Sequence, residues 1–152
     1  MKTFRLRTRI VIVALILLLA APLAVAAQGR DGIGIGVMLG EPTGLAAISW
    51  LGGGNAIDFV AAWSFRGSGS VYLHADYQFH AYVERPLTVF AGLGGFVLFQ
   101  DRPAMGLRIP LGVSFLFERA PLDFFLEVAP GMALIPATDF VVGGGLGFRF
   151  YF

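Results

Sequence analysis

From residue 32 to the end of the chain, large apolar side chains alternate with small or polar ones at a period of two. In 56–65, for example, Ile57, Phe59 and Trp63 fall on one side of the chain and Asp58 and Ser64 on the other. Successive side chains of a β-strand leave opposite faces, so this alternation is typical of strands. No stretch after residue 30 shows helical periodicity, and none approaches 18 consecutive apolar residues. The pattern therefore predicts an all-β chain.

The alternating segments are separated by short breaks rich in Gly, Pro, Asn and Ser, which are typical turn residues. They predict eight strands, at about 32–40, 44–51, 56–65, 71–82, 87–99, 106–117, 123–134 and 139–152. Pro110 and Pro130 fall within the sixth and seventh of these segments. Proline cannot donate a ladder hydrogen bond, so each either needs a bulge or marks a shifted strand boundary.

Composition narrows the class of protein. The 152 residues provide for one domain, and 57% of them are hydrophobic while only 14% are charged, against about 25% in an average soluble domain. Such an apolar chain cannot stay solvated as a disordered one. The absence of cysteine excludes a disulfide scaffold. The net charge of +1 gives no basis for nucleic-acid binding.

The N-terminus has the features of a secretory signal peptide, which we place at 1–27. Four basic residues precede an uninterrupted apolar run from Ile10 to Ala21, and small residues at 24–27 offer a cleavage site. The run is too short to cross a bilayer as a helix, which takes about 20 residues. Removal of 1–27 takes away four basic residues and no acidic one, so the net charge falls to −3 and no lysine remains. The mature domain is then 28–152, exported across the inner membrane.

The two faces of the predicted strands differ in a way that suits lipid as the solvent. One face is mostly Gly, Ala and Ser with a few charges, whereas the other carries most of the Phe residues. A closed sheet is the only sheet that leaves no unpaired backbone in hydrocarbon. The prediction is an eight-stranded antiparallel up-and-down transmembrane β-barrel. Aromatic residues near the strand ends would form its interfacial girdles: Trp50, Phe65, Phe99, Phe117, Phe140 and Phe152.

The C-terminus adds a resemblance to known proteins. Phe148, Phe150 and Phe152 alternate up to the terminal residue, which resembles the signal by which bacterial outer-membrane barrels are recognised for assembly. The whole mature chain resembles the small eight-stranded barrels of the OmpA transmembrane-domain type. The stretch Gly36–Gly44, GVMLGEPTG, further looks like a family of small outer-membrane barrel domains with no assigned function. The resemblance implies a porin-like bacterial outer-membrane protein and brings no catalytic residues.

Strand parity places a set of polar side chains toward the interior, or lumen, of the predicted barrel: Asp58, His74, Asp76, Gln78, His80, Arg108, Glu118, Glu127 and Arg149. Eight strands enclose a space just wide enough for side chains, and buried charges must be paired. We therefore predict an internal network of ion pairs and hydrogen bonds that fills the lumen, with Arg149 and Glu127 as a pair. The alternative is a narrow water path, favoured by the many lumen glycines.

Metal binding, lipid hydrolysis and ligand transport have weaker support in the sequence. His74 and His80 lie about 20 Å apart along one strand, so they cannot share one metal ion, and no metal or cofactor is predicted. A lipid-modifying hydrolase would need Ser64 and His74 within hydrogen-bond reach, and no motif surrounds either. A soluble lipocalin-like carrier would need a polar outer face. We expect a non-enzymatic structural or surface-exposed outer-membrane component. Its partners would be outer-membrane lipids and the barrel-assembly machinery, and it would be a monomer.

Overall fold

The structure is a computed structural model that describes residues 32–40, 43–64, 69–117 and 119–152. The predicted signal peptide, Phe65 and Glu118 lie outside the described residues. The described chain is all β, as predicted, with nine strands in one antiparallel sheet. The strands are β1 (Ile33–Gly40), β2 (Thr43–Gly52), β3 (Asn55–Ser64), β4 (Ser70–Glu84), β5 (Leu87–Phe99), β6 (Ala104–Arg108), β7 (Leu111–Leu116), β8 (Leu122–Ile135) and β9 (Asp139–Tyr151).

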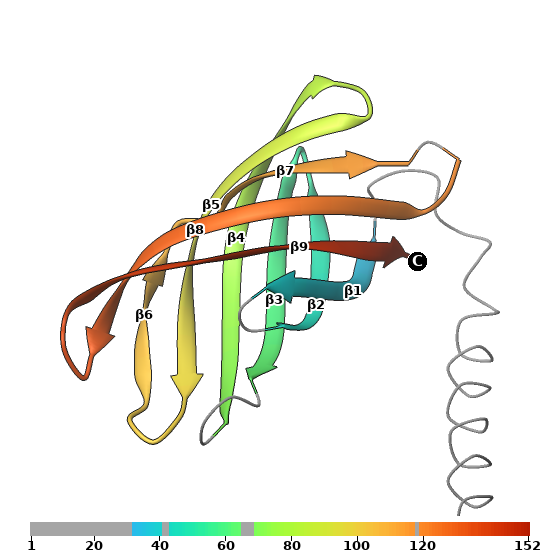
Figure 1. Ribbon diagram of the computed structural model, residues 1–152. Helices are drawn as coiled ribbons and strands as arrows, with labels where there is room; N and C mark the ends of the chain where they lie inside the picture. Colours follow the sequence, from blue (N-terminus) through green and yellow to red (C-terminus); the bar gives the residue numbers. More distant parts are fainter. Residues whose placement is uncertain (1–31, 41–42, 65–68, 118) are drawn as a thin grey trace, which may run out of the picture.

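The sheet closes on itself. Sequence neighbours pair from β1 to β5, β5 pairs both β6 and β7, β8 pairs the same two strands, and β9 pairs β8 and β1. The strands therefore surround a common interior, with β8 and β9 crossing in front of β3 and β4 in Figure 1. The last residues of β1, β3, β5 and β8 lie at one end of the ring, which we call the distal end. The C-terminus and the start of β1 lie at the other, the terminal end.

The expectation of eight strands is wrong in one place, because the sixth predicted strand is divided into β6 and β7. The pairs Gly94↔Arg108 and Ala91↔Leu111 belong to one continuous register along β5. The nine strands therefore fill eight positions around the ring. The break coincides with Pro110, whose nitrogen has no hydrogen to donate to the ladder. The Pro110 carbonyl still accepts a hydrogen bond from Gly92 N–H at 2.9 Å.

Pro130, on the neighbouring strand β8, also leaves one ladder hydrogen bond unmade. It lies within the uninterrupted β8, opposite Val142 of β9. Its carbonyl accepts from Ile109 N–H at 2.9 Å, but it returns no hydrogen bond because it is proline. Each proline removes one bond from a ladder without shifting the register. The two prolines therefore produce a strand break with no bulge.

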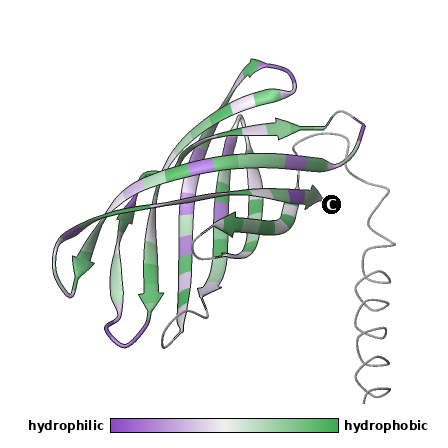
Figure 2. Cartoon of the chain, viewed as in Figure 1, coloured by the Kyte–Doolittle hydropathy of each residue, from purple (hydrophilic) through white to green (hydrophobic). Residues whose placement is uncertain are grey.

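The side chains are distributed as the alternation predicts, with apolar groups outside and polar groups inside. Figure 2 shows hydrophobic and hydrophilic residues alternating along the strands. Outward residues such as Leu45, Phe59 and Leu126 are about half exposed, at 53%, 51% and 50%. Ten of the described polar or charged residues are buried instead: Asp58, His74, Asp76, Gln78, Thr88, Arg108, Ser114, Asp123, Glu127 and Arg149. The described residues contain no helix long and apolar enough to cross a membrane.

Glycine is required at two kinds of position. Gly52, Gly53 and Gly54 form the β2–β3 turn with φ values of 89°, 61° and 82°, a region that L-residues with a Cβ atom rarely adopt. Gly36 of β1 lies against the backbone of β9, where a Cβ atom would come within 2.7 Å of the Arg149 Cα. This close approach leaves room inside the ring for the Arg149 side chain.

Candidate functional site

The interior polar residues form a connected network centred on Arg108. Seven of the predicted lumen residues are buried: Asp58, His74, Asp76, Gln78, Arg108, Glu127 and Arg149. His80 is half-buried, and Glu118 lies outside the described residues. These side chains come from β3, β4, β6, β8 and β9, so closure of the sheet brings them together.

Arg108, the last residue of β6, uses all three nitrogens of its guanidinium group. Nη2 donates to Glu127 Oε1 in a very short contact, and Nη1 donates to the Tyr72 hydroxyl oxygen at 3.0 Å and to His74 Nδ1. Nε lies 3.3 Å from Asp76 Oδ2. The planar donor fork of arginine suits such simultaneous contacts. Arg108 therefore ties β4, β6 and β8 together across the interior.

His74 acts as a neutral bridge within this network. Arginine can only donate, so His74 Nδ1 accepts and Nε2 carries the ring hydrogen. Nε2 lies 3.5 Å from both Asp58 Oδ2 and Asp76 Oδ2. Ligand atoms of these three residues all lie within 4.8 Å of one another, a spacing that could hold a metal ion. In the arrangement present, the hydrogen on Nε2 faces the two carboxylates, so the three side chains form an electrostatic cluster.

Sequence reasoning missed this cluster because it compared only His74 and His80 along one strand. His80 lies away from it, where its Nε2 donates to Gln78 Oε1 at 3.0 Å. The signal that could have found the cluster is cross-strand register, since Asp58 and Asp76 are direct partners on β3 and β4.

The predicted ion pair between Arg149 and Glu127 is wrong. Arg149 Nη2 instead lies 3.2 Å from Asp58 Oδ1, while Glu127 pairs with Arg108. On the β8–β9 ladder, Arg149 lies opposite Asp123 and Glu127 lies opposite Gly145. The two positions are four residues apart along the strand, a distance of about 13 Å.

The terminal half of the interior is packed with aromatic and apolar groups. The Arg149 guanidinium carbon lies 3.9 Å from the centroid of the Phe125 ring. The Tyr151 hydroxyl donates to Asp123 Oδ2 at 2.7 Å, a polar pair that the sequence analysis did not select. Spacing could have found Asp123, which is four residues before Glu127 and so on the same face. Together these groups fill the ring near its terminal end.

Trp50 belongs to this interior packing and not to an outer girdle, so its predicted position is wrong. It packs against a cluster of Ile48, Ala56 and Tyr151, and its ring centroid lies 4.6 Å from that of His80. Its parity on β2 matches the inward Ile48, which accounts for its orientation. Three other predicted girdle residues, Phe99, Phe117 and Phe140, are exposed. Phe152 is half-buried.

The residues of the suggested hydrolase are not brought together. Ser64 lies opposite Ser70, and His74 lies opposite Val60. Four residues of strand separate the two positions, about 13 Å, whereas a nucleophile and its base need roughly 2.6–3.2 Å. Ser64 and His74 therefore do not form a catalytic pair in this structure.

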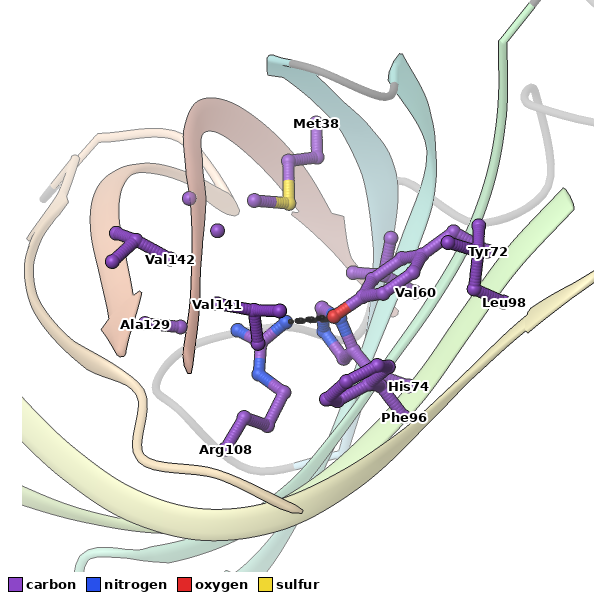
Figure 3. A pocket seen from close by; sticks show the side chains of 12 residues that line it. Met38, Val60, Tyr72, His74, Phe96, Leu98, Arg108, Ala129, Val141 and Val142 are labelled. Carbon is purple, nitrogen blue, oxygen red and sulfur yellow. Dashed lines mark hydrogen bonds between the residues drawn. The ribbon is translucent and has the colours of Figure 1, made fainter. Parts of the chain in front are cut away.

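The distal half of the interior contains a pocket of about 190 Å³. Figure 3 shows Met38, Val60 and Phe96 in its wall, with Tyr72, His74 and Arg108 on the side of the charged network. The interior is therefore divided into an open distal pocket, a charged middle layer and a packed terminal half. Comparison with protein-family models, curated proteins and solved structures finds no match to the chain.

Proposed function

We propose that the chain is an integral outer-membrane β-barrel, exported with the help of residues 1–27 and inserted as a non-enzymatic structural or surface-exposed membrane component. One observation carries the proposal: large apolar side chains cover the outside of the closed ring, and a cluster of charged side chains is buried inside. A protein dissolved in water has the opposite arrangement. A lipid environment is the solvent that matches this surface.

The extent of the apolar surface strengthens the argument. Outward residues that are 38–68% exposed occur on every strand of the ring, including Ile35, Leu45, Trp63, Leu73, Leu93, Leu107, Val113, Leu126 and Leu146. The largest apolar patch on a soluble monomer is usually only about 300–600 Å². Strand lengths of 8 to 15 residues around most of the ring suit tilted transmembrane strands, which need about 9–11 residues.

The interior supports a filled barrel in preference to a conducting one. Phe125, Tyr151 and Arg149 are each no more than 1% exposed and occupy the terminal half. The separation of Ser64 from His74 favours a protein without hydrolase activity. At the C-terminus, Phe148 is outward and exposed, and the Phe150 and Phe152 rings lie 5.2 Å apart. This terminal group would serve as the contact for the barrel-assembly machinery.

The proposal predicts that the folded protein resists SDS until it is heated. A closed barrel keeps its hydrogen-bonded sheet in SDS at room temperature, so unboiled protein should migrate differently from boiled protein on a gel. The sample would be protein purified from the outer-membrane fraction with detergent. An identical mobility before and after boiling, together with a protein that stays soluble without detergent, would contradict the proposal.

A further inference from the structure

The distal pocket has a mostly apolar wall and one polar side. The wall includes Met38, Val60, Phe96, Leu98 and Val141. Its volume of about 190 Å³ exceeds that of an engineered apolar cavity of about 150 Å³ that binds benzene. The pocket therefore has room for a molecule the size of a substituted benzene ring.

The charged groups at the pocket are already in contact with one another. The donors of Arg108 contact Glu127, Asp76, His74 and the Tyr72 oxygen. Four buried carboxylates, those of Asp58, Asp76, Asp123 and Glu127, outnumber the two buried guanidinium groups. An anionic ligand would therefore be repelled, and the apolar wall disfavours a charged ligand of either sign, because burying an unpaired charge is costly.

Among the described side chains that line the pocket, Tyr72 provides a hydroxyl hydrogen that is available for a polar contact. Its hydroxyl oxygen accepts from Arg108 Nη1 at 3.0 Å, so its hydrogen must point elsewhere. Among the described residues no acceptor receives that hydrogen. The ring is held in place by stacking on Phe96, with centroids 5.7 Å apart. The hydroxyl thus offers a fixed donor at the edge of an apolar pocket.

The pocket lies beside the stretch of β9 that follows its last described pair with β1. The last pair between β1 and β9 is Gly40↔Gly145, whereas β9 continues to pair with β8 as far as Asp139. The residues just beyond that last pair, 141–144, line the pocket. Among the described residues, this stretch of β9 pairs with β8.

From these observations we infer that the distal pocket binds a small, uncharged, mainly apolar molecule that carries one hydrogen-bond acceptor. The apolar body contacts the wall, and the acceptor receives the Tyr72 hydroxyl hydrogen. The charged layer below closes the pocket, so the ligand is held and does not pass through the ring.

The test uses two probes of nearly the same shape, acetophenone with a carbonyl acceptor and α-methylstyrene without one. Binding is followed by NMR of ¹³C-labelled methionine methyl groups in purified protein in detergent micelles. Met38 is 5% exposed in the pocket, whereas Met105 and Met132 are outward and 45% and 47% exposed. Site binding predicts a saturable shift of the Met38 signal alone. Equal, non-saturating shifts of all three signals would show partition into the micelle and overturn the inference.

Two variants test the pocket contacts. Tyr72→Phe should weaken acetophenone binding by about threefold to tenfold, the range for one hydrogen bond, and leave α-methylstyrene binding unchanged. Ala129→Leu narrows the pocket and should weaken both probes, whereas the outward Ala75→Leu should weaken neither. Since Tyr72→Phe removes only one oxygen atom, it tests the inference even if Ala129→Leu fails to fold. Equal affinity of acetophenone for Tyr72→Phe and the unaltered protein would overturn it.

Discussion

Replacing Arg149 by methionine is expected to lower the free energy of unfolding by about 3–5 kcal/mol, the cost of removing one partner of a buried ion pair. Arg149 is 1% exposed and lies 3.2 Å from Asp58 Oδ1. Asp123 lies directly opposite it on β8. Without the guanidinium group these carboxylates stay buried with less positive charge near them. Urea unfolding of the protein folded in detergent micelles gives the measurement.

The control for this prediction is Arg102→Met, because Arg102 is exposed in the turn between β5 and β6. A surface change of this kind should alter stability by no more than about 0.5 kcal/mol. The double variant Arg149→Met with Asp58→Asn should recover part of the loss, since it removes one of the uncompensated charges. If Arg149→Met were as stable as Arg102→Met, the charges would be solvated and the interior would be a water-filled path.

Replacing Leu126 by arginine is expected to cost about 2–4 kcal/mol in a bilayer if the site lies near the midplane, and about 0–1 kcal/mol near an interface. Leu126 points outward from β8 and is 50% exposed. Its cross-strand neighbours are Val113 and Leu146, which are also apolar and outward. The measurement is reversible unfolding from lipid vesicles.

The matched control is Gln100→Arg, which adds the same charge at an exposed position beside the β5–β6 turn. It should cost much less, because Gln100 lies just beyond the end of β5, outside the apolar surface that the strands form. A Leu126→Arg variant that is neutral, or that makes the protein more soluble without detergent, would mean that this face is in water.

Alternation alone was sufficient to predict most of the fold. It identified the strands and assigned inward and outward faces correctly for Asp58, Glu127 and Leu107, because strand geometry fixes which side chains share a face. Proline chemistry identified Pro110 as a disturbance of the ladder. It could not decide between a bulge and a break, since that depends on the register of both neighbouring strands.

The pairing of the charges was less predictable. Whether Arg149 meets Glu127 or Asp58 depends on how far neighbouring strands are shifted along each other and on what fills the interior between them. Reasoning from neighbouring strands alone missed the contact across the ring between Arg149 on β9 and Asp58 on β3. Trp50 was misplaced for a similar reason, because aromatic character was given more weight than its parity with Ile48.

The central claim is that the outer face of the ring contacts lipid, and spin-label accessibility tests it most directly. The chain has no cysteine, so single cysteines can carry a nitroxide at Phe59, Leu93, Leu126 and Leu146 without further changes. Asp101, exposed in the β5–β6 turn, provides the aqueous reference. In lipid vesicles, we expect the four outward labels to be relaxed strongly by oxygen and weakly by a water-soluble nickel complex, with the opposite result at Asp101. Strong relaxation by the nickel complex at all five positions would contradict the account.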